Sequence, residues 1–337
     1  MKTPTLSALA LFTLVAAAPL LRAQSNLEDI STTPVPAAAE AAALDPEKEP
    51  SKKSQDSKGI AFLPPKSGIR QELSLDYGYA AGSDLKKSGA SGSLQEQSSH
   101  FAYNLTVPLD AKWTTRFGIA ESRIDFGRPG GSPLPQNLQT TTLSLGAQYK
   151  IDDHWAAFGA IAPRLSLIDG WDRINSQEVQ FGGAVGAVYI VNRDLVFTMG
   201  LGINPGNEDL PVMPLVGVHW VFAKDWTLDL GIPRTALSYQ ILPKLKLIPV
   251  MVGFDGGTFH TSKTYGNAFG QPGLNDKKLQ YTEVRVGSGA SYAFLPNLSL
   301  DLTGGVIAYR KFDFKDGGYS PQADPAPYAQ IGLKLGF

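Results

Sequence analysis

The sequence predicts an all-β protein, a closed antiparallel transmembrane β-barrel of about fourteen strands. Three observations predict this fold. The chain ends in "PYAQIGLKLGF" (327–337), in which apolar residues alternate with polar or small residues as they do along a strand with one apolar face. A turn motif with aromatic or apolar rims recurs six times, and the connections on the other side are long and variable. Short turns on one side and long loops on the other are typical of outer-membrane barrels.

The composition excludes several classes of function. The chain of 337 residues has 35 glycines, no cysteine and a formal net charge of −1. Without cysteine there are no disulfides, no thiolate catalysis and no cysteine-bound metal. A net charge near zero gives no electrostatic reason to expect nucleic acid as a partner.

The N-terminal part divides into two segments before the predicted barrel. Residues 1–23 have the features of a signal peptide: Lys2, an apolar run over 6–21, and the small residue Ala23 at the expected cleavage position. A transmembrane anchor is the alternative, but Pro19 interrupts the run and the run is short. Residues 24–66 are rich in Ala, Pro, Lys and Glu, so we expect a disordered periplasmic tail. The barrel is expected over 67–337.

The six turn motifs predict tight hairpins with an aromatic girdle. They are VPLDAKW (107–113), YKIDDHW (149–155), YIVNRDL (189–195), WVFAKDW (220–226), YQILPKL (239–245) and YAFLPNL (292–298). Their rims share one face, and indole rings prefer the boundary between lipid and water. A soluble sandwich would instead spread its tryptophans along the strands. The predicted girdle consists of Trp113, Tyr149, Trp155, Tyr189, Trp220, Trp226, Tyr239 and Tyr292.

Six short turns, with both ends of the barrel on the same side, imply fourteen strands. The interval 226–241 is short for two spanning strands, which need about 9–11 residues each. It forms either a low hairpin within the wall or a local excursion that leaves twelve strands. The short turns are expected to face the periplasm. The expected extracellular loops are 80–97, 127–137, 169–176, 204–210, 256–277 and 312–324.

Strand alternation assigns a set of charged residues to the lumen, opposite the apolar face. The lumen candidates are Glu72, Asp76, Arg116, Asp229, Glu283, Arg285, Asp301 and Lys334. Charges of both signs form either a porin-like constriction or pairs that plug a narrow lumen. Segment 256–277, with Phe259, Tyr265 and Phe269, is expected to fold inward or to bind an external partner, with a solvated flexible loop as the alternative.

No motif indicates catalysis. The four histidines lie in no spacing that predicts a catalytic triad or a metal site, and no phosphate-binding loop is present. We therefore expect no enzyme activity, no metal and no cofactor.

The terminal "GLKLGF", the alternating strands and the signal peptide resemble the bacterial outer-membrane β-barrel superfamily. Over 67–337 the chain is similar to uncharacterised barrel families described as domains of unknown function. The resemblance implies a place in the cell outer membrane, contact with outer-membrane lipid, and Phe337 as the terminal signal for the barrel-assembly machinery. The expected function is a passive, porin-like pore for small solutes. The alternative is a plugged structural or partner-binding barrel that acts through its extracellular loops or its N-terminal tail.

Overall fold

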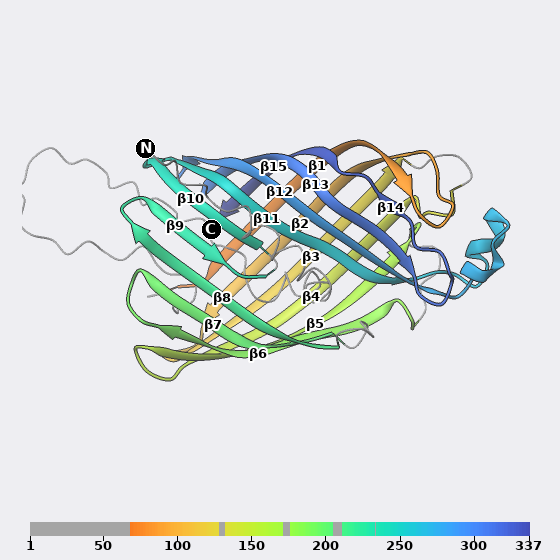
Figure 1. The fold of residues 1–337 in the computed structure, drawn as a ribbon. Helices are drawn as coiled ribbons and strands as arrows, with labels where there is room; N and C mark the ends of the chain where they lie inside the picture. Colours follow the sequence, from red (N-terminus) through yellow and green to blue (C-terminus); the bar gives the residue numbers. More distant parts are fainter. Residues whose placement is uncertain (1–67, 128–131, 171–175, 205–210, 233) are drawn as a thin grey trace, which may run out of the picture.

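The computed structural model describes residues 68–127, 132–170, 176–204, 211–232 and 234–337. The predicted signal peptide and tail lie outside the described residues. Within them the chain forms an antiparallel barrel of fourteen strands (Figure 1). One short extra strand, β14, follows β13 in the sequence and pairs with β13 and β1. Both the all-β class and the predicted number of strands are confirmed.

The strands run in chain order around the barrel. They are β1 (Arg70–Lys86), β2 (Ser93–Pro108), β3 (Trp113–Gly127), β4 (Asn137–Lys150), β5 (Trp155–Ile168), β6 (Val179–Ile190), β7 (Leu195–Ile203), β8 (Val212–Ala223), β9 (Trp226–Leu230), β10 (Arg234–Leu242), β11 (Leu245–His260), β12 (Lys278–Leu295), β13 (Leu298–Phe314), β14 (Gln322–Ala323) and β15 (Ala326–Gly336). Two short 3₁₀ helices, η3 (Tyr265–Phe269) and η4 (Pro272–Leu274), lie between β11 and β12.

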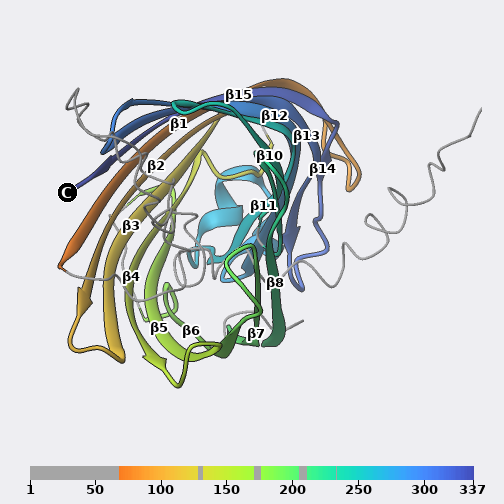
Figure 2. The same ribbon diagram turned by 90° about the vertical axis from the view of Figure 1, so that its left-hand side faces the viewer.

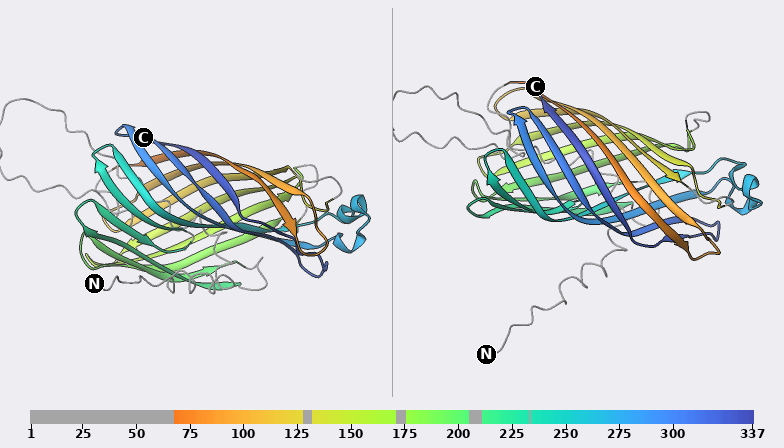
Figure 3. Two further views of the ribbon diagram at one scale, coloured as in Figure 1. Left: turned by 45° about the horizontal axis from the view of Figure 1, so that its top comes forward. Right: turned by 90° about the horizontal axis from the view of Figure 1, so that it is seen from above.

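The barrel closes because β15 lies between β13 and β1 and is paired with both. Figure 3 shows the C-terminal strand beside β1 along the wall. The backbone N–H of Phe337 donates to the carbonyl oxygen of Gln71 at 2.9 Å, so the last residue is held at the rim. The closing strand therefore explains why the alternation continues to the terminus.

The interval 226–241 is a low hairpin within the wall. The five residues of β9 pair with β8 on one side and with β10 on the other. The excursion that would have left twelve strands is therefore wrong.

Turn chemistry explains the short-turn end, which faces the viewer in Figure 2. One carboxylate oxygen of Asp110 accepts the backbone N–H groups of Lys112 and Trp113, both at 2.7 Å. Asp152 does the same two strands later, at 2.7 and 2.8 Å. These hydrogen bonds mimic a backbone turn and lower the pKa of both carboxyl groups below the usual range, because they stabilise the charged form.

Aromatic side chains at this end form cross-strand pairs. The ring centroids of Trp113 and Tyr149 are 4.8 Å apart, and those of Trp155 and Tyr189 are 4.6 Å apart. Trp226 and Tyr239 form a third pair at 4.7 Å, while Trp220 and Tyr292 are exposed on the outer surface. The residues of each pair lie directly opposite in neighbouring strands. The predicted girdle residues thus gather at the short-turn rim, and their role as membrane anchors stays a prediction.

The two faces of the wall exchange polarity toward the long-loop end. On the outer face of β3, exposed Phe117 and Ile119 give way to exposed Glu121. On the inner face of the same strand, half-buried Arg116 gives way to buried Phe126. Apolar side chains face lipid in a membrane and face inward in water. The wall therefore changes from a membrane-type to a soluble-type barrel along its length.

Several strands are longer than a membrane requires, which corrects the predicted loop bounds. β12 has 18 residues and β1 and β13 have 17 each, whereas about 9–11 suffice to span. Predicted loop 80–97 narrows to a connection of 87–92, and predicted loop 256–277 narrows to 261–277. Residues 312–314 likewise belong to β13. The polar outer residues of these extensions resemble loop residues in sequence, although their backbones are paired.

Candidate lumen site

The long-loop end of the barrel is filled by an apolar cluster. Its buried members are Leu85, Leu94, Ile124, Phe126, Leu134, Leu138, Phe259, Tyr265, Leu274, Leu279, Tyr281, Phe312, Phe314, Tyr319 and Ala323. They come from β1–β4, from β11–β14 and from the connections between strands. This arrangement resembles the core of a small soluble barrel.

The 261–277 connection lies over this end of the barrel. Tyr265 of η3 is buried, and its hydroxyl donates to the carbonyl oxygen of Pro133 at 3.2 Å. Leu274 of η4 is fully buried, and Phe269 packs against the same cluster. The segment therefore packs onto the end of the barrel through Tyr265 and Leu274, although residues 270–273 are exposed. That its exposed residues bind an external partner stays a prediction.

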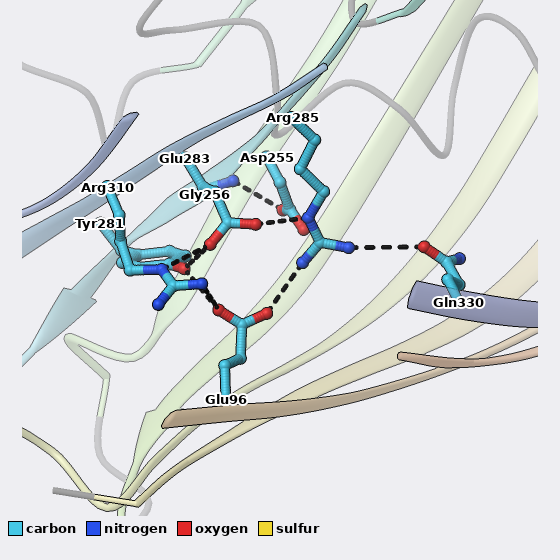
Figure 4. Close-up of polar contacts among 8 residues, drawn as sticks. All are labelled: Glu96, Asp255, Gly256, Tyr281, Glu283, Arg285, Arg310 and Gln330. Atoms are coloured by element: carbon cyan, nitrogen blue, oxygen red, sulfur yellow. Dashed lines mark hydrogen bonds and ion pairs between the residues drawn. The ribbon is translucent and has the colours of Figure 1, made fainter. Parts of the chain in front are cut away.

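A cluster of four ionisable side chains lies beside the apolar cluster (Figure 4). The Nη2 atom of Arg285 lies 2.8 Å from Glu96 Oε1, and that of Arg310 lies 2.6 Å from Glu96 Oε2. Arg310 Nε donates to Glu283 Oε2 at 2.9 Å, and Arg285 Nε donates to the other oxygen of Glu283. Each guanidinium thus bridges both carboxylates. We call these four residues the ionic cluster.

Three members of the ionic cluster are closed off from solvent, and the fourth, Arg285, also lines the cavity. The side chains of Glu96, Glu283 and Arg310 are 2%, 0% and 1% exposed, and that of Arg285 is 15% exposed. The hydroxyl of Tyr281 donates to Glu283. Each carboxyl group is paired with both guanidinium groups, and buried ionisable groups are tolerated when they are paired and hydrogen-bonded in this way.

The structure brings only some of the predicted lumen residues together. Glu283 and Arg285 belong to the ionic cluster. Asp76, Asp301 and Lys334 line a cavity inside the barrel, on the short-turn side of this cluster. Lys334 and Asp301 form an ion pair at 2.8 Å.

The other three predicted lumen residues lie outside the lining of this cavity. Asp229 is paired with His219 at 2.6 Å in neighbouring strands. Glu72 and Arg116 are half-buried on β1 and β3. That any of these residues lies on a path for solutes stays a prediction.

Sequence reasoning missed Glu96 and Arg310. Glu96 fell within a predicted loop. Arg310 was missed because a β-bulge shifts the pairing of β12 and β13: Val284 lies opposite Tyr309, but Arg285 lies opposite Ile307. The extra residue moves Arg310 from the outer to the inner face. The only signal in the sequence is local, since Arg310, Phe312 and Phe314 alternate with Lys311 and Asp313.

The cavity has a volume of about 360 Å³ and is lined by both polar and apolar side chains. Hydroxyl and amide groups come from Ser74, Ser98, Ser122, Thr140, Thr142, Asn104 and Gln330. Charged groups of both signs come from Asp76, Arg164, Arg234, Asp255, Arg285, Asp301 and Lys334. These charged, hydroxyl and amide groups can form hydrogen bonds with water and with polar solutes.

The described residues bring no three His, Asp or Glu side chains into a group that could hold a metal ion. In the same residues, neither 3₁₀ helix is long and apolar enough to cross a membrane. The expectations of no metal, no cofactor and no catalysis stay predictions.

Several solved barrels are similar to this one. A deletion mutant of the TodX monoaromatic hydrocarbon channel is 12% identical, with 82% of this chain and 93% of that chain covered and a TM-score of 0.47. A Pseudomonas aeruginosa FadL homologue is 11% identical, with 80% and 89% covered and a TM-score of 0.41. An outer membrane channel from Pseudomonas putida F1 is 9% identical, with 82% and 98% covered and a TM-score of 0.43.

No curated protein sequence matches the chain significantly. Residues 71–336, which include nearly the whole barrel, match a family described as "Domain of unknown function (DUF6268)". The match agrees with the resemblance inferred from the strand pattern and the terminal motif, and the chain therefore belongs to the DUF6268 family.

Proposed function

We propose that the protein is an outer-membrane channel for small polar solutes, closed at its long-loop end in the conformation described. One observation carries the proposal: the cavity of about 360 Å³, with charged and hydroxyl groups among its lining, inside a wall whose outer band is apolar. A barrel that serves only as a scaffold can fill its interior with side chains. Glycine, serine and threonine positions on β1–β4 and β15 instead leave room for water and solute.

The closure is local. The apolar cluster and the ionic cluster lie toward the long-loop end, and part of the apolar cluster comes from the 261–277 connection. Moving that connection removes Tyr265 and Leu274 from the cluster without changing any strand. We infer that opening of the channel begins there.

A plugged barrel is the second candidate function, and the same apolar cluster favours it. A core of buried aromatic and aliphatic side chains is costly to open, because each exposed side chain loses its burial energy. In this alternative the barrel acts through its exposed loops and not through its lumen.

Conductance separates the two functions. The protein is refolded into a planar bilayer, and the wild type is compared with a variant in which residues 263–276 are replaced by a short Gly-Ser linker. The matched control replaces 87–92, a connection that supplies only Ala90 to the edge of the cluster. A channel gives few openings in the wild type and the control and stable current in the 263–276 variant. Silence in all three supports the plugged barrel.

The surroundings of the protein follow from the same proposal. We infer that it lies in the outer membrane with its short turns toward the periplasm, that it is inserted by the barrel-assembly machinery, and that it is not an enzyme. The mature chain is expected to begin near Gln24 and to fractionate with the outer membrane. A soluble chain that retains Met1 would contradict this assignment.

A further inference from the structure

The hydroxyl group of one lumen tyrosine, Tyr328, forms no hydrogen bond with the described residues. Tyr328 on β15 is 7% exposed and lines the cavity. Its hydroxyl oxygen is buried and has no hydrogen-bond partner among the described residues. A buried hydroxyl without a partner destabilises the fold, so the group needs a reason to be there.

Glycines leave room for the hydroxyl group of Tyr328. Tyr328 lies opposite Gly305 on β13, and Gly305 lies opposite Gly287 on β12. A Cβ atom on Gly287 would lie 2.7 Å from the Tyr328 hydroxyl oxygen, which is too close for an ordinary contact. The ring therefore extends across the inner wall at a place where neighbouring strands carry no side chains.

One guanidinium group lies over the ring of Tyr328, and a second lines the same cavity. The guanidinium carbon of Arg285 lies 5.5 Å from the centroid of the Tyr328 ring. The charge of Arg285 is matched by the ionic cluster. Arg234, at the start of β10, lines the same cavity, and its buried Nε has no hydrogen-bond partner among the described residues. Arg234 is thus a cation with donor capacity left for a ligand.

The carboxylates of the cavity are not the partners of the Tyr328 hydroxyl or of the Arg234 Nε atom. Asp301 is paired with Lys334, and Asp255 accepts the backbone N–H of Gly256 at 2.6 Å. Asp76 lies on β1, four residues toward the short-turn end from Ala80, the residue opposite Tyr328.

We propose that Tyr328 and Arg234 form an anion site in the lumen that binds the carboxylate of a small organic acid. A hydroxyl donor and a guanidinium are the groups that proteins commonly direct at a carboxylate. The site names a substrate class for the cavity and in that respect rests on the proposed channel function, although binding can be measured without transport.

The test uses acetate as the probe and neutral acetamide, which has nearly the same shape, as its control. Binding is followed by ligand NMR on the mature chain refolded in detergent. Wild type is expected to bind acetate and not acetamide. Tyr328→Phe keeps the ring, and Arg234→Gln keeps much of the side-chain length; each is expected to weaken acetate binding about tenfold or more, as the loss of a hydrogen bond to a charged group implies.

Two exterior substitutions serve as matched controls. Tyr79→Phe changes a tyrosine on the exposed outer face, and Arg123→Gln changes an arginine paired with Asp125 outside the lumen. Both are expected to bind acetate like the wild type. Absence of acetate binding in the wild type, equal binding in Tyr328→Phe, or equal affinity for acetamide would overturn the anion site. Acetate binding without conductance would reject the proposed channel but support the anion site. Conductance without acetate binding would support the channel but reject the anion site.

Discussion

Removing Arg310 is expected to be among the most damaging single changes to the barrel. Its guanidinium contacts both Glu96 and Glu283, and its side chain is 1% exposed (Figure 4). In Arg310→Met the apolar stem is largely kept, but the ionic cluster changes from neutral to a net charge of −1. Breaking a buried ion pair by removing one partner costs about 3–5 kcal/mol, because the remaining charge has no compensation.

The neighbouring residue provides a matched control. Lys311 lies on the other face of β13 and pairs with Asp313 at 2.9 Å, where both side chains are 20% exposed. Pairs of this kind near the surface contribute about 0–1 kcal/mol. Lys311→Met therefore removes one positive charge from the same strand with a small expected effect.

The free energy of unfolding is measured in urea for the refolded barrel, with the fraction folded read from gel mobility. The double variant Arg310→Met, Glu96→Gln returns the cluster to neutrality, so it is expected to recover part of the loss, with a coupling energy of about 0.5–3 kcal/mol. If Arg310→Met costs no more than Lys311→Met, the four charges do not act as a buried unit and this reasoning is wrong.

Three further changes test other parts of the barrel. Leu302 is 50% exposed on the outer face, so Leu302→Lys should make insertion less favourable by about 2–4 kcal/mol near the midplane. Asp301→Lys, on the inner face, should insert normally. Equal insertion yields of the two variants would contradict the assignment of faces. Folding lowers the pKa of Asp110, so the ionised carboxylate stabilises the barrel fully above about pH 4, and this stabilisation is lost as the pH falls through the lowered pKa. In an acid titration of the free energy of unfolding, Asp110→Ala should therefore lose less stability than the wild type. Phe337 is largely exposed at the rim, so Phe337→Ser should leave the stability of the refolded barrel nearly unchanged but reduce the amount assembled in cells, and wild-type assembly levels would contradict its role as a terminal signal.

The predictable part of the fold depends on local patterns. The turn carboxylates of Asp110 and Asp152 bind nearby backbone N–H groups, so their effect is contained in a few consecutive residues. The alternation over 327–337 likewise needs no knowledge of the partner strand. Counting six such turns was sufficient to reach the correct strand number, including the short hairpin of β9 and β10.

The ionic cluster was beyond this kind of reasoning for two physical reasons. A bulge between β12 and β13 reverses the alternation, and whether a bulge forms depends on both strands together. Alternation also assigns faces by assuming that apolar side chains meet lipid, which holds only within the membrane band. Beyond it Phe126 and Phe312 point inward and are buried, so the same rule fails there. Glu96 lies in this extension and could not be placed without its partners.

The ionic cluster also offers a reason for using arginine at position 310. Its members come from β2, β12 and β13, and Glu96 and Arg285 are 189 positions apart in the sequence. A one-residue slip of β13 would turn Lys311 inward in place of Arg310 and invert every side chain on the strand. A lysine ammonium is a point charge and cannot reproduce the planar, forked donors with which Arg310 reaches both carboxylates.

The exchange Arg310→Lys with Lys311→Arg tests this point at constant composition and charge. If the planar fork selects the register, the exchange should lower the free energy of unfolding by about 1–3 kcal/mol, because buried carboxylate oxygens lose hydrogen bonds. Arg310→Lys alone should cost nearly as much, since Lys311→Arg lies outside the cluster. If the exchanged protein is instead as stable as the wild type, only the charge at this position matters, and the register of β13 is set by the apolar residues Phe312 and Phe314 on its inner face.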